Sequence, residues 1–177
     1  MTEISDDFHS SETISGLLES RRGLHVFVDG CHKPGSGHGG WAFVAYRDGV
    51  EIALEFGGVE RSTNNAMELT AVLQAIIWIN RIATSAPAVI WSDSVYAVEG
   101  CNRWRPIWKN NGWKKSNPGG KVRNRAISDA DLWKAVDLRL SENPSISIAW
   151  CKGHSGIAGN ERADELSDQG RRSIRRT

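Results

Sequence analysis

The chain has 177 residues, of which 40% are hydrophobic and 24% are charged, and its formal net charge is +1. These values are typical of one globular domain, large enough to bury a core without disulfides or a structural metal. The three cysteines lie far apart and indicate neither a disulfide framework nor a zinc site. The longest apolar run, residues 71–79, contains Gln74 and is too short to span a bilayer. The N-terminus lacks the basic and apolar regions of a signal peptide, so we expect the protein in the reducing cytoplasm. Nothing in the sequence requires an oligomer, and we expect a monomer.

The first 22 residues are rich in serine and acids and show no periodicity, so we expect a mobile tail; a short helix over 14–18 is the alternative. After this tail the apolar pattern predicts three strands joined by tight turns, over 24–28, 41–46 and 50–56. A long helix then begins where Thr63, Asn64 and Asn65 can cap its first N–H groups, and it ends before Pro87.

The remaining elements alternate between strand and helix. We expect a strand over 88–91, a short helix over 94–100, a helix from a capping box at 128–131 to about 140, a strand over 146–150, and a last helix from about 159 to 170. This order predicts an α/β fold whose five-stranded mixed sheet combines three antiparallel strands with parallel crossovers, flanked by helices. The domain is expected to span 23–170, followed by a basic tail over 171–177.

Four acids stand at places where chemistry is plausible. Asp29 and Asp93 follow buried strands, and Glu68 and Asp164 lie on helices. Each has a structural alternative: a turn residue, a helix cap, a favourable charge near a helix N-terminus, or a solvated helix face. Ligands bind where strands end in an open α/β sheet, and carboxylates gathered there would repel each other unless a cation such as Mg²⁺ or Mn²⁺ joined them. Two such ions are the usual device for splitting a phosphodiester.

The segment 101–125 is basic and rich in tryptophan. Every charged residue from Arg103 to Arg125 is a cation, and Trp104, Trp108 and Trp113 are interleaved with them. Cations bind phosphates by releasing counterions, and aromatic faces support sugars or bases. The alternative is that the tryptophans hold the insert to the domain while the charges are solvated. We expect a mixture, with tryptophans mainly structural and cations mainly functional.

From about residue 24 to 170 the chain resembles a type 1 ribonuclease H. The matching segments are F-V-D-G before a glycine-rich turn, T-N-N-A-M-E-L, W-S-D-S-V-Y and W-C-K-G-H-S-G-I-A-G-N-E-R-A-D. The resemblance implies a ribonuclease H-like fold and an endonuclease that cuts the RNA strand of RNA–DNA hybrids with two Mg²⁺ ions, for which Mn²⁺ can substitute, leaving 5′-phosphate and 3′-hydroxyl ends. The insert resembles the basic protrusion with which some members grip the DNA strand.

The resemblance also implies roles for individual residues. The metal ligands are expected to be Asp29, Glu68, Asp93 and Asp164. His154 is the expected proton-transfer residue, since imidazole titrates near neutral pH and the neighbouring glycines would let it move. Contacts with substrate are expected from Asn64, Asn65, Asn160, Trp104, Lys114, Lys115 and Lys121. Val95, Gly35 and Cys31 depart from residues common in the family, and we expect these changes to affect affinity or cleavage preference rather than catalysis.

Three other functions compete with this interpretation. A DNA-directed nuclease of the same architecture would share the acids but not the K-G-H-S-G segment together with the basic insert. A non-catalytic nucleic-acid-binding module would not be expected to keep all four acids. A glycosidase needs only two carboxylates, and the polycationic insert argues against it.

Overall fold

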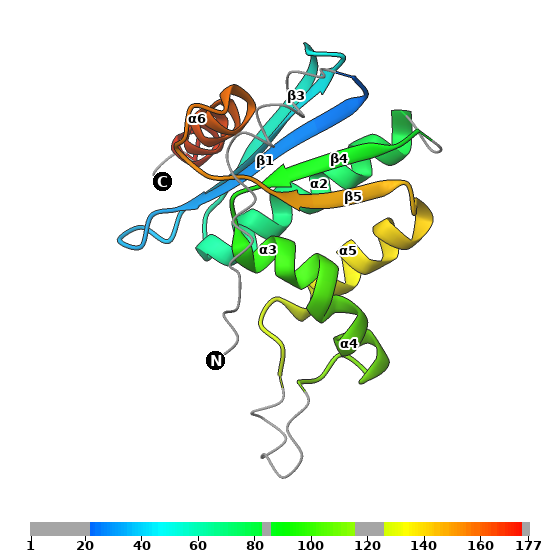
Figure 1. Cartoon of the computed structure of the whole chain (residues 1–177). Helices are drawn as coiled ribbons and strands as arrows, with labels where there is room; N and C mark the ends of the chain where they lie inside the picture. Colours follow the sequence, from blue (N-terminus) through cyan, green and yellow to red (C-terminus); the bar gives the residue numbers. More distant parts are fainter. Residues whose placement is uncertain (1–21, 83–85, 116–125, 175–177) are drawn as a thin grey trace, which may run out of the picture.

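The computed structural model describes residues 22–82, 86–115 and 126–174, and its centre is a five-stranded sheet. The strands are β1 (Leu24–His32), β2 (Gly39–Arg47), β3 (Val50–Val59), β4 (Ala88–Ser92) and β5 (Ile146–Trp150). They lie in the order β3-β2-β1-β4-β5 (Figure 1). β1, β2 and β3 pair antiparallel, whereas β4 pairs parallel with both β1 and β5. The predicted mixed sheet is therefore confirmed.

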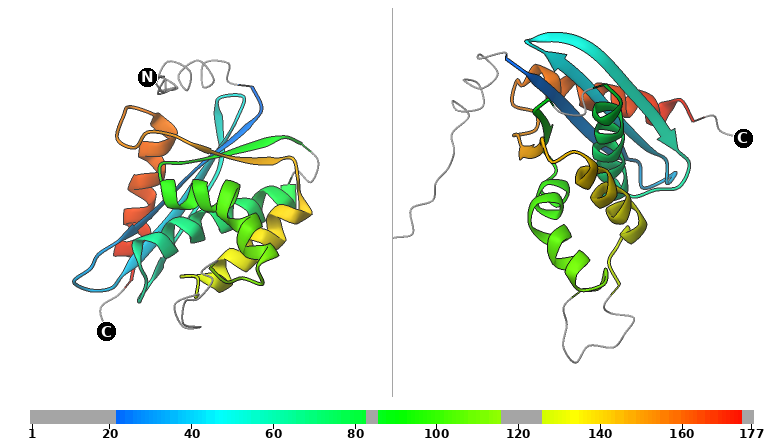
Figure 2. Two further views of the ribbon diagram at one scale, coloured as in Figure 1. Left: turned by 60° about the horizontal axis from the view of Figure 1, so that its bottom comes forward. Right: turned by 90° about the vertical axis from the view of Figure 1, so that its right-hand side faces the viewer.

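The helices cover both faces of this sheet. They are α2 (Asn64–Ile82), α3 (Val95–Glu99), the π-helix η1 (Gly100–Trp104), α4 (Arg105–Asn110), α5 (Ala130–Glu142) and α6 (Ala158–Arg172). Alternate residues of β1 point to opposite faces. Val26 and Val28 belong to the core under α2 and α5, while Phe27 belongs to a second core under α6. α4 lies at the end of the helical layer remote from the sheet (Figure 2).

Two helix boundaries differ from the sequence prediction. The helix predicted to end at 100 continues through η1 and α4 to Asn110, because Trp104 and Trp108 pack with Tyr96 and Trp133 and hold the segment against the domain. α6 continues to Arg172 rather than ending at 170, and ion pairs from Arg171 and Arg172 to Asp168 stabilise its last turn.

The two predicted helix starts have different outcomes. Thr63 caps α2 as expected, since its Oγ1 accepts from the Ala66 N–H at 3.1 Å. The capping box predicted for α5 is wrong: Asp129 occupies the N-cap position with φ 58° and makes no side-chain cap bond. Its carboxylate instead lies 3.5 Å from the Tyr96 hydroxyl, so tertiary packing displaces the local cap.

The N-terminal tail predicted over 1–22, apart from Arg22, lies outside the described residues, as do Lys121 and the end of the basic tail. Within the three described ranges, no helix combines the length and the apolar character needed to cross a membrane.

Candidate metal and nuclease site

Three of the four predicted acids meet at one edge of the sheet. The parallel pairing of β1 with β4 places Phe27 beside Trp91, so the same register continued by two residues brings Asp29 level with Asp93. Glu68 reaches them from the beginning of α2. One carboxylate oxygen from each of the three acids lies within 4.8 Å of the other two. Oxygen ligands at this spacing could hold a hard divalent cation such as Mg²⁺ or Mn²⁺.

Two acids of the cluster are buried and the third, Asp93, is partly buried. Asp29 is 6% exposed and Glu68 is 5% exposed. Burial raises the pKa of Asp29 from 3.8 to about 6, with the charges of Asp93 and Asp164 adding to the effect. Burial, followed by the charges of Asp29 and Asp93, raises the pKa of Glu68 well above its usual value. In the described part of the chain no lysine or arginine forms an ion pair with any of these acids.

Neutral donors orient the three carboxylates. The Gly30 N–H donates to Glu68 Oε2 at 3.1 Å, and the Ser167 hydroxyl donates to Asp29 Oδ2 at 2.5 Å. The Asn160 amide donates to Asp93 Oδ2 at 3.3 Å. The structural alternative for Asp93 as a helix cap is wrong, because Ser94 Oγ accepts from the Ala97 N–H and caps α3. The Asp93 carboxylate is thus left facing the other acids.

Asp164 lies next to the cluster but not within it. This residue is partly exposed on α6 and does not share the 4.8 Å spacing of the other three acids. Its negative charge nevertheless raises the pKa of both Asp29 and Glu68, so the fourth carboxylate acts on the same small volume. A single cation would use the inner three acids, and a second cation could bind between them and Asp164.

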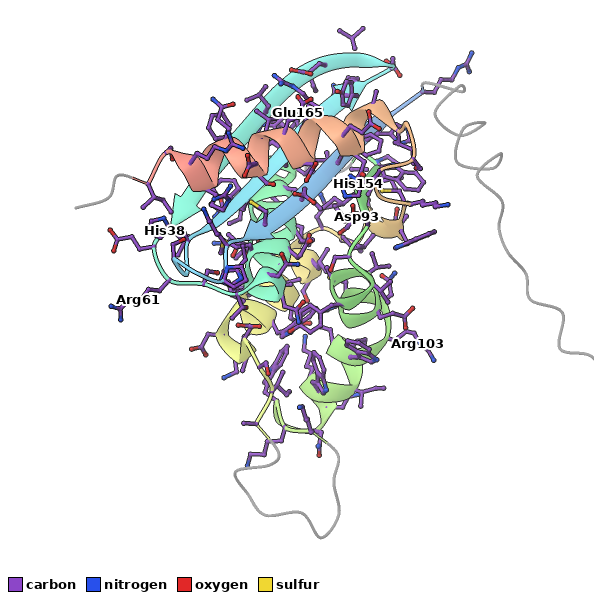
Figure 3. The ribbon with its side chains drawn as sticks, turned by 90° about the vertical axis from the view of Figure 1, so that its left-hand side faces the viewer. His38, Arg61, Asp93, Arg103, His154 and Glu165 are labelled. Atoms are coloured by element: carbon purple, nitrogen blue, oxygen red, sulfur yellow. The ribbon has the colours of Figure 1, made fainter. Side chains whose placement is uncertain are left out.

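His154 is exposed in the loop between β5 and α6, near Asp93 (Figure 3). The imidazole is close enough to Asp29 that its positive form lowers the pKa of that carboxyl. His154 has a φ of 50°, a backbone conformation that favours glycine. Gly153 lies directly on Asp93: a Cβ at this position would be 2.4 Å from Asp93 Oδ2. Gly153, which was expected to make the loop flexible, therefore also allows the loop to lie close to Asp93.

The predicted substrate-contacting residues do not form one surface: some are exposed at the start of α2, some are exposed beyond α4, and one is buried. Asn64 and Asn65 are exposed at the start of α2, one turn before Glu68. Asn160 is only 2% exposed and contacts Asp93 rather than solvent. Lys114 and Lys115 are exposed beyond α4, whereas Lys121 is outside the described residues.

The insert is attached to the domain by aromatic rings and by two ion pairs to the buried Asp137. Trp104 packs on Tyr96 and Trp108 and is partly exposed, which fits the expected structural role of the tryptophans. Arg105 and Lys109 both bind the carboxylate of Asp137 on α5, Lys109 at 2.8 Å. These two cations therefore hold the insert in place, and for the other cations of the insert a mainly functional role stays a prediction.

Sequence reasoning missed Asp137 and Ser167. The signal for Asp137 was an acid between apolar Val136 and Leu138 on α5, opposite an Arg and a Lys spaced four residues apart. The signal for Ser167 was its spacing from Asn160 and Asp164, which places all three on one face of a helix.

Comparison with known proteins agrees with this geometry. The RNase H family model matches residues 21–172. Ribonuclease H of Dichelobacter nodosus is 39% identical over 152 residues, which cover 86% of this chain and 94% of that protein. Ribonuclease H of Cupriavidus necator is 38% identical over 153 residues, covering 85% of this chain and 97% of that protein.

Solved structures give the same fold. The PFV RNase H domain aligns with a TM-score of 0.70 at 24% identity, covering 86% of this chain and 96% of that domain. LC9-RNase H1, described as a type 1 RNase H with the type 2 active-site motif, aligns with a TM-score of 0.67 at 27% identity, covering 84% of this chain and 71% of that one. The sheet order, the acid cluster and the extent of these matches lead to one conclusion: the chain belongs to the ribonuclease H family of hydrolytic endoribonucleases, in its bacterial type 1 branch.

Proposed function

We propose that this chain hydrolyses the RNA strand of RNA–DNA hybrids and leaves 5′-phosphate and 3′-hydroxyl ends. The observation that carries the proposal is the cluster of Asp29, Glu68 and Asp93, whose carboxylates lie within 4.8 Å of one another with no cationic side chain to neutralise them in the described residues. Family membership supports the reaction class, and the cluster supports our assignment of the reaction to this part of the sheet.

The donor set fits Mg²⁺, with Mn²⁺ as the alternative, because both prefer carboxylate oxygens. Asp29, Glu68 and Asp93 would hold one ion, and Asp164 with Asp29 would complete the site for a second. When bound, the two ions supply an activated water and charge stabilisation for the leaving oxygen.

The remaining residues have separate tasks in this proposal. His154 is exposed and close to the acids, and it is the proposed proton-transfer residue. It gives a proton to the leaving oxygen or positions the attacking water. Asn64 and Asn65 present amides beside Glu68, where they can hydrogen-bond the hybrid. An RNA strand is distinguished from DNA by its 2′-hydroxyls, which both donate and accept hydrogen bonds.

The insert over 101–125 is proposed to bind the other strand. Lys114, Lys115 and Lys121 provide phosphate contacts, and the partly exposed ring of Trp104 provides a surface for a sugar or a base. The proposed catalytic domain is 23–170, and we propose that it works as a monomer.

The test is a cleavage assay on three duplexes of one sequence: an RNA–DNA hybrid, double-stranded RNA and double-stranded DNA, each end-labelled on either strand. We expect cleavage of the RNA strand of the hybrid in Mg²⁺ or Mn²⁺, with products that a ligase accepts without prior phosphorylation, and no cleavage in EDTA. Equal cleavage of double-stranded DNA, or cleavage that persists in EDTA, would contradict the proposal.

A further inference from the structure

One face of α6 carries two hydrogen-bond donors and one acid toward the cluster. Asn160, Asp164 and Ser167 are spaced by four and three residues, so they form one stripe along the helix. Asn160 and Ser167 are 2% and 0% exposed, and each donates to a different carboxylate, Asp93 and Asp29 respectively. The helix that carries the fourth acid thus also holds two of the other three.

Ser167 is the donor that Asp29 depends on. Its Oγ lies 2.5 Å from Asp29 Oδ2, a length typical of a hydroxyl donating to a carboxylate anion. Among the described residues no other side chain donates to this carboxylate. The same Oγ lies 2.9 Å from the carbonyl of Asp164 and is also close to the Cys31 thiol. A carbonyl inside a helix already accepts a backbone N–H, and a thiol is a weak acceptor, so the single hydroxyl proton is best used by Asp29.

Packing alone does not explain a serine at this position. α6 lies so tightly on β2 that a Cβ at Gly40 would be 2.0 Å from the Ser167 carbonyl oxygen. Such closeness requires glycine at position 40, and it involves only the backbone carbonyl of Ser167, so it does not select a hydroxyl-bearing side chain at 167. The hydroxyl is the part of the side chain that packing does not need, and it points to an acid of the cluster.

We propose that Ser167 is a positioning residue, which fixes the Asp29 carboxylate through one oxygen so that the other can bind a divalent cation. The inference rests on the proposed function, because it assigns Asp29 to the metal. Partners that orient metal ligands contribute strongly: losing one typically costs roughly 10- to 100-fold in metal affinity or activity. Ser167 makes no proposed contact with the nucleic acid, so its effect should not extend to substrate binding.

The test is Ser167→Ala, with Ser173→Ala as the matched control. Ser173 is the C-cap of α6 and, like Ser167, has its hydroxyl near the carbonyl three residues earlier, at 2.6 Å, but this bond is to Gly170 and touches no acid of the cluster. We expect Ser167→Ala to weaken Mg²⁺ binding, measured by calorimetry without substrate, by roughly 10-fold or more. It should also lower kcat at limiting Mg²⁺ and leave KM for the hybrid unchanged. Ser173→Ala should match the wild type in all three measurements.

Unchanged Mg²⁺ affinity in a folded Ser167→Ala protein would overturn the proposal, and so would a raised KM with normal Mg²⁺ affinity. A measurement on the wild type covers the case in which the variant does not fold. In mixed H₂O and D₂O, a buried hydroxyl held by Asp29 should exchange slowly and give Ser167 ¹³Cβ two resolved resonances; a single averaged resonance would refute the bond. Calorimetry and this resonance need no hybrid, so they remain informative even if the cleavage assay fails.

Discussion

Asp29 and Asp137 are equally buried, at 6% exposure each, yet their surroundings are opposite. Asp137 lies between Arg105 and Lys109, and although burial opposes it, hydrogen bonds from these two cations lower the pKa of Asp137. In the described ranges, Ser167 is the one side chain that donates to the Asp29 carboxylate, and burial together with neighbouring acids raises the pKa of Asp29 to about 6. Within the part of the chain that the structure describes, Asp137 forms ion pairs with two basic side chains, whereas Asp29 forms none with a lysine or arginine.

The difference shows that burial of an acid does not by itself identify a metal site. A buried carboxylate is costly unless it is paired, and Asp137 is paired by the chain itself. At Asp29 the partner that we propose is a divalent cation, which three oxygen donors favour. Asp137 also divides the cations of the insert. Arg105 and Lys109 pair with it and are structural, whereas Lys114 and Lys115 are exposed and are proposed to bind substrate.

The largest expected effect is on catalysis. Asp29→Asn should lower kcat by at least roughly 10³-fold, as expected for the loss of a preorganised charged group, while hybrid binding stays nearly intact. Asp137→Asn should leave kcat unchanged when it is assayed below its melting temperature, because the Asp137 carboxylate pairs with Arg105 and Lys109 of the insert and not with the acid cluster. Single-turnover cleavage and a binding titration in Ca²⁺ measure the two effects. Activity of Asp29→Asn above about one tenth of wild type would contradict its proposed role.

His154 extends the comparison to a residue that lies near the acids but is not a proposed metal ligand. His154→Ala should slow turnover by roughly 10²- to 10⁴-fold, the usual range for a positioned acid or base. Mg²⁺ affinity measured by calorimetry should stay at the wild-type value, because His154 is exposed and is not a proposed ligand. A marked fall in that affinity would show that the histidine belongs to the metal site.

The two aspartates should also differ in the sign of their effect on stability. In EDTA at pH 7, Asp29→Asn should raise the free energy of unfolding by about 1–3 kcal/mol, because it removes a buried charge that its neighbours repel. Asp137→Asn should lower it by about 1–3 kcal/mol, since two charged hydrogen bonds are weakened and Lys109 is half exposed. Denaturant melts of both variants, with and without excess Mg²⁺, test this. Destabilisation by Asp29→Asn in EDTA would mean that Asp29 is a structural turn residue.

The pH dependence of the metal-free protein should show both environments. The folded protein keeps the Asp29 proton up to a pKa of about 6, whereas the unfolded chain releases it near 3.8. Stability therefore falls as pH rises through this window, by about 1 kcal/mol between pH 5 and pH 7 for Asp29 alone, and the raised pKa of Glu68 adds in the same direction. The lowered pKa of Asp137 has the opposite sign, because its contribution is present above its unfolded pKa and is lost as pH falls.

Thermal melts from pH 4 to pH 8 in EDTA measure this dependence. Asp29→Asn should flatten the decline between pH 5 and pH 7, and saturating Mg²⁺ should remove it in the wild type by binding the folded state. A decline that survives both changes would place its origin in other groups.

The sequence was sufficient for the sheet and for the acids, and insufficient where tertiary contacts override local signals. The succession of strands and helices along the chain followed from periodicity and turn residues. Asp29 and Asp93 were expected together at the ends of their strands and do lie together, although Asp29 lies inside β1, which continues to His32 rather than ending at 28. The capping box predicted over 128–131 failed because the helix begins one residue later, with Asp129 at the N-cap position in a left-handed conformation and its carboxylate near Tyr96, which is distant in sequence. The α4 segment was not predicted as a helix, because its stability comes from contacts of Trp104 and Trp108 with other elements. Periodicity cannot report such contacts.

The smallest expected effect concerns the cations of the insert that Asp137 does not hold. Neutralising three lysines together should raise KM for the hybrid by a few-fold and reduce its salt dependence; these are Lys114, Lys115 and Lys121. Each lost phosphate contact should lower the slope of log affinity against log salt by roughly one unit or less.

A charge-matched control neutralises three exposed arginines away from the insert and the acids, namely Arg47, Arg81 and Arg139. This control should change neither KM nor its slope. Arg105 and Lys109 are left intact in both variants, because their loss would release the insert and confuse a binding effect with an unfolding one. If the lysine variant and the arginine variant have the same KM at every salt concentration, the lysines are merely solvated, and Asp137 then organises an insert that does not bind the substrate.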